Sequence, residues 1–128
     1  ERVEWHIAGV LARLRMSRGF PLVSPPLHAG SISELRLHFV PGSQWQASGR
    51  KAAPAGTPSR GAVRVKLGEG VPRTAVRFNL RVGGVLQGPF ACDFTEREVH
   101  ECALSMDWTS QADADKGNLC ICLELLDS

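Results

Sequence analysis

The stretch Val76-Arg77-Phe78-Asn79-Leu80-Arg81-Val82 alternates strictly between apolar and polar side chains. Successive side chains of a β-strand point to opposite faces, so this period of two predicts a strand with one face in a core and the other in water. The same alternation recurs in five further segments of the 128-residue chain: 10–16, 35–39, 63–67, 101–108 and 119–125. We expect another strand near 90–95, and the first strand to begin as early as Trp5–Ile7.

Turn-forming residues separate these segments, which favours short strands joined by tight connections. The turn signals are Pro41-Gly42, Gly68-Glu69-Gly70, Gly83-Gly84, Gly88-Pro89 and Lys116-Gly117-Asn118. Strands that are apolar on one face only are typical of antiparallel sheets packed face to face. The sequence therefore predicts one all-β domain over residues 1–128, an antiparallel β-sandwich of seven to eight strands.

Two segments depart from this pattern of alternating strands and turns. Residues 46–61 are rich in Ala, Gly, Ser and Pro and offer little apolar area to bury, so we predict a long flexible hairpin loop there. Thr95-Glu96-Arg97-Glu98 resembles a capped helix start, which predicts a short turn of helix near 94–99.

The amino-acid composition limits the classes of protein to which this chain can belong. Hydrophobic residues make up 43% and charged residues 22% of the chain, as in ordinary globular domains, and no apolar run is long enough for a membrane helix. The chain opens on Glu1-Arg2-Val3-Glu4 rather than on Met, and we expect it to be one domain of a larger protein. Four cysteines allow disulfides by number, but a chain of this size does not require them. We expect reduced thiols and an intracellular, cytoplasmic setting.

The net charge of +2 hides an uneven distribution. Residues 1–81 carry 13 Lys or Arg against four Asp or Glu, whereas residues 82–128 carry two against nine. Opposite charges that face each other across strands stabilise sheets, so we expect pairing between the halves within one molecule. Self-association through the two halves, and steering of an external partner, stay open as alternatives.

Side chains able to carry chemistry are present but scattered. His6, His28, His38 and His100 are joined by no Cys-x-x-Cys or His-Glu-x-x-His pattern, so we expect no catalytic or metal site, no cofactor and no enzyme. Asp107, Asp113 and Asp115 gather in one loop, and carboxylates there are an alternative C2-like calcium site. EF-hand spacing fails and a second Asp cluster is missing, which favours a solvated turn.

Seven cationic side chains fall on the outward faces of their segments. They would form one basic surface if their strands shared a sheet, and such a surface is the alternative basis for binding nucleic acid or acidic lipid. No exposed aromatic side chains are interleaved with them, so nucleic acid is not the favoured partner. The seven residues are Arg13, Arg15, Arg36, Arg64, Lys66, Arg77 and Arg81.

Cys120 and Cys122 lie two apart on one predicted strand and so share a face. This is not a zinc-finger spacing, and we expect buried thiols that act as small hydrophobic side chains. Burial of that face as well would place the last strand in the centre of its sheet. Trp5 and Trp108 are expected in the core, and Trp45, after the Pro41-Gly42 turn, is the best candidate for an exposed aromatic anchor.

Five segments in order resemble one known family: 5–7 (Trp-His-Ile), 22–30, 35–42, 76–82 and 113–124. Together they are similar to the MATH, or TRAF-C-like, domain family. The resemblance spans nearly the whole chain and implies an eight-stranded antiparallel sandwich that binds short peptides or helps assemble complexes. Family members that bind peptides use an aromatic-lined groove along a sheet edge. This chain departs from them, because it has no Tyr and lacks a Trp-Gly-Phe type of segment between Phe90 and Trp108.

We therefore predict a non-enzymatic protein–protein interaction module with a protein or peptide partner. Strand addition to a sheet edge supplies backbone hydrogen bonds, and pockets for alternate side chains supply specificity. The weakest alternation lies near 90–100, which points to an edge there. The predicted partner-binding residues are Phe90, Phe94, Val99, His100 and Trp45.

Overall fold

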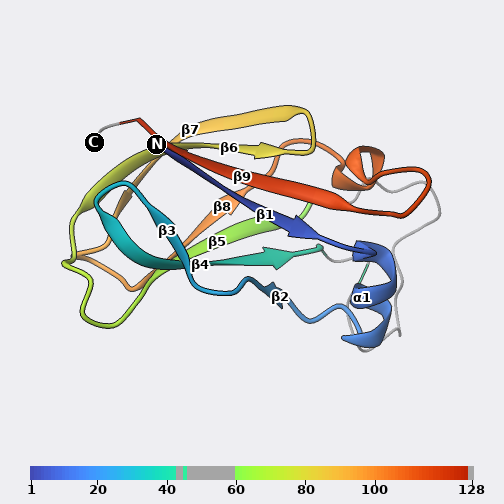
Figure 1. Cartoon of the computed structure of the whole chain (residues 1–128), viewed down its shortest axis with the longest axis horizontal. Coiled ribbons are helices and arrows are strands. Elements are labelled where there is room, and N and C mark those ends of the chain that lie inside the picture. The colour runs from blue at the N-terminus through green and yellow to red at the C-terminus, as the bar shows by residue number, and fades with distance from the viewer. Residues whose placement is uncertain (43–44, 46–59, 127–128) are drawn as a thin grey trace.

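A computed structural model describes residues 1–42, 45 and 60–126. The chain forms two antiparallel β-sheets packed face to face, with two short helices gathered at one end of the sandwich (Figure 1). The predicted fold class, an all-β antiparallel sandwich, is confirmed. The loop predicted at 46–61 falls almost wholly outside the described residues.

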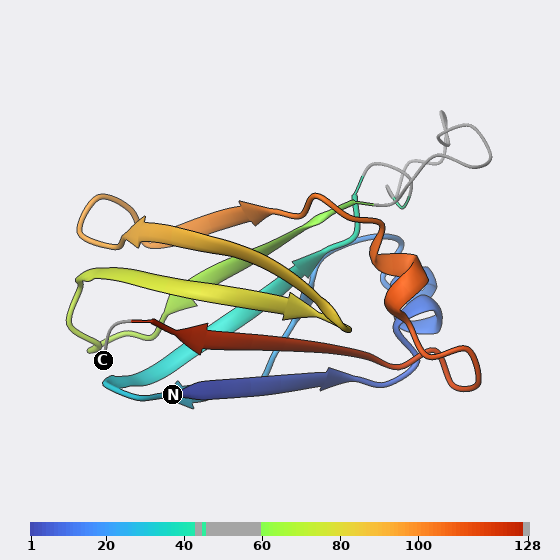
Figure 2. The same cartoon turned by 90° about the horizontal axis from the view of Figure 1, so that it is seen from above.

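Sheet A has four strands in the order β1 (Arg2–Ile7), β9 (Leu119–Leu125), β6 (Ala75–Val82) and β7 (Val85–Asp93). Sheet B has β4 (Ile32–Val40) at its centre, followed by β5 (Ala62–Leu67) and β8 (Val99–Ala103). On the other side of β4, the short strands β2 (Leu22–Val23) and β3 (Leu27–Ala29) both pair with it. Figure 2 shows the two layers from above, with β7 and β8 along the same side of the sandwich.

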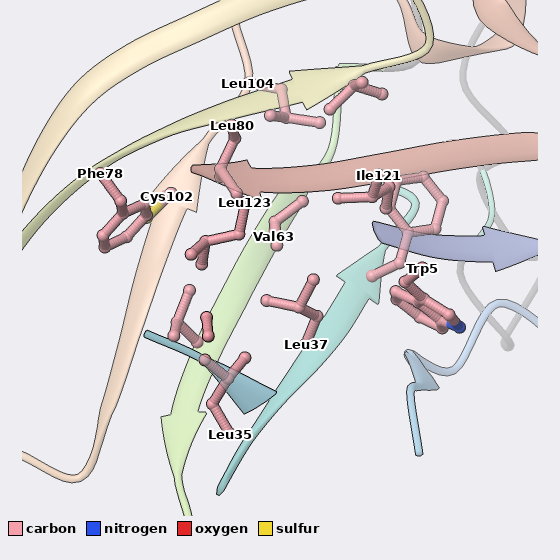
Figure 3. Close-up of a cluster of buried hydrophobic side chains, with 14 of the residues drawn as sticks. Trp5, Leu35, Leu37, Val63, Phe78, Leu80, Cys102, Leu104, Ile121 and Leu123 are labelled. Atoms are coloured by element: carbon pink, nitrogen blue, oxygen red, sulfur yellow. The ribbon is translucent and has the colours of Figure 1, made fainter. Parts of the chain in front are cut away.

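The alternating segments supply the core between the sheets. Leu35, Leu37 and Val63 of sheet B face Leu80, Ile121 and Leu123 of sheet A (Figure 3). All six side chains are buried, as the period of two predicts. Trp5 and Trp108, predicted to lie in the core, are also buried.

Residues 10–16, predicted as a strand, form the helix α1 (Val10–Met16) instead. Val10 and Leu14 are buried, and they are four residues apart, which places them on one face of a helix as well as on one face of a strand. Met16 is 87% exposed although the strand pattern predicts it inside. The short run satisfies both periods, and packing against the end of the sandwich selects the helix.

Two predictions around β8 are wrong. The strand predicted over 101–108 runs earlier, and Trp108 begins the 3-10 helix η2 (Trp108–Gln111), whose first turn is capped by the Asp107 carboxylate accepting from the Thr109 N–H at 3.0 Å. The turn of helix predicted near 94–99 is absent from this described stretch. There Asp93 accepts from the Thr95 and Glu96 N–H groups and forms a tight turn between β7 and β8.

Gly88-Pro89, predicted as a turn, lies inside β7. The β6–β7 hairpin turns at Gly83-Gly84, between the paired residues Val82 and Val85. Register shifts opposite Gly88-Pro89, between Phe78 and Leu80, so the β7 strand bulges there rather than ending. A proline is tolerated because β7 is an edge strand.

Candidate functional site

In the described part of the chain, the sheets have four edges, and three of these edges are protected against pairing with another chain. β2 and β3 are short and separated by Pro25-Pro26, β7 contains Pro89, and β1 lies against β3 of the opposite sheet. β8 contains no proline, and among the described strands it borders only β5 within sheet B. The prediction of a sheet edge between 90 and 100 is confirmed, and β8 is its least protected part.

The register of β5 and β8 sets which backbone groups of β8 point outward. Leu104 N–H donates to the Gly61 carbonyl at 3.2 Å, and β5 and β8 pair antiparallel from Ala62–Ala103 to Lys66–Val99. Hydrogen-bonded pairs alternate with non-hydrogen-bonded pairs along such a ladder. Val99, Glu101 and Ala103 therefore direct their N–H and C=O groups away from β5. They form a row of backbone donors and acceptors at the free edge.

The predicted partner-binding residues of this region are only partly available. Val99 is half-buried and lies on β8 itself, and Phe90 is half-buried with its ring 5.9 Å from that of Phe78. Phe94 is only 2% exposed, so its prediction as a contact residue is wrong. His100 donates from Nε2 to the Asp93 carbonyl at 2.8 Å, and its ring lies 4.7 Å from that of Phe94. Phe94 and His100 thus hold the β7–β8 connection rather than present a surface.

Trp45, predicted as an exposed anchor, is half-buried. Its ring centroid lies 5.8 Å from that of Trp108, which in turn meets Phe39 edge-on at 5.0 Å. Trp45 extends an aromatic cluster at the end of the core. This ring contact with Trp108 packs the Trp45 side chain against the fold.

A pocket of about 250 Å³ opens on the outer face of sheet B beside the start of β8. Charged groups of both signs line it, which suits a polar or charged side chain better than an apolar one. Its lining residues are Glu34, Arg36, His38, Lys66, Leu67, Gly68, Glu69, Arg73 and Glu98.

The seven outward cations do not form one basic surface, which corrects that prediction. Arg13 and Arg15 lie on α1, Arg77 and Arg81 on sheet A, and the other three, Arg36, Arg64 and Lys66, on sheet B. Arg64 Nε donates to Glu101 Oε1 at 2.8 Å across the β5–β8 ladder. This ion pair joins the basic and acidic halves within one molecule, as expected.

The cations of sheet B act on His38. Burial first, and then Lys66, Arg64 and Arg36, hold the pKa of His38 below its ordinary value of 6.5. The unfolded chain therefore binds a proton before the folded one does as the pH falls. We expect the contribution of His38 to stability to be complete above pH 6.5 and to be lost as the pH falls through the window just below that value.

Lys66→Met is accordingly expected to raise the pKa of His38 toward 6.5 in an NMR titration. Lys116→Met, in the turn before β9, is the matched control and should leave that titration unchanged. An unaltered His38 titration in the Lys66 variant would show that the charge of Lys66 does not lower the pKa of His38.

The loop carboxylates serve local structure. Asp107 caps η2, and Asp113 Oδ1 accepts from the Asp115 N–H at 2.8 Å. These hydrogen bonds form local turns at Asp107 and Asp113.

The last strand is central in sheet A, as its two-faced burial predicts, and Cys122 is buried while Cys120 is half-buried. Sequence reasoning missed what surrounds Cys120. Its Sγ lies 3.6 Å from Glu4 Oε2, and His6 Nε2 lies 4.0 Å from the same oxygen. Burial first, and then Glu4, raises the pKa of the Cys120 thiol to about 11. The only hint in the sequence is that Glu4 and His6, like Cys120 and Cys122, are two apart in strand-like segments.

No helix of the described residues is long and apolar enough to cross a membrane. The sequence matches no protein-family model, and no curated protein matches it.

Proposed function

We propose that this domain is a non-enzymatic interaction module that captures an extended peptide by adding it as a strand to β8. The observation that carries the proposal is the unprotected edge of β8, where Val99, Glu101 and Ala103 direct backbone groups outward. The resemblance to MATH domains supports the same role, because it implies a peptide-binding antiparallel sandwich. A reducing, intracellular setting belongs to this proposal.

An added strand would place alternate side chains on the outer face of sheet B, beside those of Val99, Glu101 and Ala103. Ala103 is exposed and small, so it leaves room for a large peptide side chain at one end. At the other end, Val99 is next in the chain to Glu98 of the 250 Å³ pocket. The mixed charges of that pocket favour a polar or charged side chain. Backbone pairing supplies affinity, and these two positions supply specificity.

The test removes one outward N–H without disturbing the sandwich. Ala103→Pro deletes a donor that faces away from β5, so the fold should persist, because proline is tolerated where a strand N–H faces solvent. Peptides selected by the wild-type domain from a displayed random library are expected to bind this variant at least about tenfold more weakly in a calorimetric titration, since a hydrogen bond is lost and the proline ring obstructs pairing.

Arg2→Pro is the matched control. Leu125 N–H donates to the Glu1 carbonyl, so Arg2 also directs its N–H outward, but on β1 at the opposite edge of the molecule. This variant should bind the selected peptides like the wild type. Equal affinity of the Ala103 variant would refute strand addition at β8. Peptide binding that is insensitive to both variants but collapses at high salt would show that the peptides are held by charge and not by strand addition.

A further inference from the structure

On the outer face of sheet A, two neighbouring strands carry four side chains of types that can ligate metals. In the β1–β9 ladder Glu4 is paired with Cys122 and His6 with Cys120. The Leu125–Glu1 hydrogen bond sets the alternation, so both of these are non-hydrogen-bonded pairs. In such pairs the Cα atoms are closest, at about 4.5 Å, and the side chains stand nearest to each other. The register therefore brings the ends of the chain together into one donor cluster.

Three donor atoms of this cluster already lie near one another. Glu4 Oε2, His6 Nε2 and Cys120 Sγ are all within 4.8 Å, with Oε2–Sγ at 3.6 Å and Oε2–Nε2 at 4.0 Å. Tetrahedral zinc, with bonds of about 2.0 Å to N or O and about 2.3 Å to S, needs its ligand atoms about 3.3 to 3.6 Å apart. The His6 and Glu4 side chains are 72% and 43% exposed, so small rotations can close the remaining gap.

We propose that Glu4, His6 and Cys120 bind a divalent transition-metal ion of the zinc class on the outer face of sheet A. A carboxylate, an imidazole and a thiolate are ligands that zinc accepts together, whereas calcium and magnesium require oxygen ligands. Three protein ligands leave the fourth tetrahedral position to water. The Cys120 thiol releases its proton to solvent as the metal–sulfur bond forms.

The surroundings orient these ligands. Arg2 lies 3.7 Å from Glu4 Oε1, the carboxylate oxygen that does not face His6 and Cys120. This contact leaves Oε2 directed at the other two donors. Cys120 is held on the central strand β9, which hydrogen-bonds to strands on both sides, and that strand provides a rigid base.

Metal bound here would join the edge strand β1 to β9. Because a ligand that binds only the folded state stabilises it by mass action, the metal should raise the midpoint of thermal unfolding. The site lies on sheet A, whereas the proposed peptide edge belongs to sheet B, so the two proposals stand or fall separately.

The test uses Co²⁺ and Zn²⁺ with the whole reduced domain. Co²⁺ is expected to produce the thiolate-to-metal charge-transfer and visible absorption bands of a tetrahedral site, and Zn²⁺ to bleach them and to raise the Tm. Cys120→Ser should abolish the charge-transfer band, and His6→Ala and Glu4→Gln should each weaken Zn²⁺ binding by at least about tenfold. Ca²⁺ and Mg²⁺ should not raise the Tm.

The controls separate this site from general metal binding. His28→Ala removes an exposed histidine of β3, and Glu124→Gln removes a carboxylate from the same face of β9 beyond Cys122. Both should retain wild-type Zn²⁺ affinity. No thiolate band with Co²⁺ would overturn the proposal. Zn²⁺ binding that is lost in Cys120→Ser and in Cys122→Ser but unchanged in His6→Ala and Glu4→Gln would also overturn it, because the thiol pair alone would then hold the metal.

Discussion

Replacing Trp108 by alanine is expected to lower the free energy of unfolding by about 3 to 5 kcal/mol, the usual cost of deleting a buried large aromatic side chain. Trp108 is fully buried, and its ring meets Phe39 edge-on at 5.0 Å. Its Nε1–H also donates to the Pro41 carbonyl at 2.9 Å, so the truncation leaves that carbonyl without its partner. Chemical denaturation followed by far-UV circular dichroism measures the effect, since tryptophan fluorescence changes with the substitution itself.

Trp108→Phe is the matched control, because it keeps a ring in the cluster and removes only the donor and part of the volume. Its loss should be smaller than that of the alanine variant, at about 1 to 3 kcal/mol. A loss below about 1 kcal/mol for Trp108→Ala would contradict the placement of this residue at the centre of the aromatic cluster.

Gly61→Ala is expected to destabilise the domain by about 3 kcal/mol or more, for two reasons that add. Gly61 has φ of +59°, a left-handed conformation that costs alanine about 1 to 2 kcal/mol. A Cβ there would also overlap the Val40 carbonyl oxygen and lie 3.1 Å from the Pro41 carbonyl oxygen. Both contacts are with backbone at the end of β4, which cannot move away without breaking the β4–β5 pairing.

Gly70→Ala separates the two causes. Gly70 also has a positive φ, +80°, but a Cβ there meets no atom within 4 Å. Its substitution should cost only the conformational part, about 1 to 2 kcal/mol by denaturant unfolding. Equal losses at the two glycines would show that the close approach at Gly61 is relieved in solution.

Alternation located the central strands because the large apolar side chains of each of them lie on the inner face. Leu35, Leu37, Leu80 and Leu123 all lie in the core on the predicted face. The rule failed where the buried residues fit both periods, as Val10 and Leu14 do in 10–16, or where a strand ends and a 3-10 turn begins, as before Trp108. At 10–16 packing at the end of the sandwich decides the conformation, and before Trp108 the Asp107 cap starts the 3-10 helix.

The sequence indicated one of the two candidate sites and missed the other. The weak alternation near 90–100 indicated a sheet edge, which β7 and β8 confirm, but it did not show that Phe94 is buried beneath it. The cluster of Glu4, His6 and Cys120 was missed altogether. Two residues in the first strand and one in the last are adjacent only because β1 pairs with β9 in one register.

The sequence by itself determined the fold class, the core faces of the main strands and the opposite charges of the two halves, because these follow from local periodicity and composition. Only the tertiary structure decided which sheet edge is unpaired, which aromatic side chains are buried and which metal-ligating side chains lie next to each other. Those properties depend on strand order and register, and residues distant in the chain set them together. A shift of one residue in the β1–β9 register would turn either Glu4 and His6 or their partners to the opposite face.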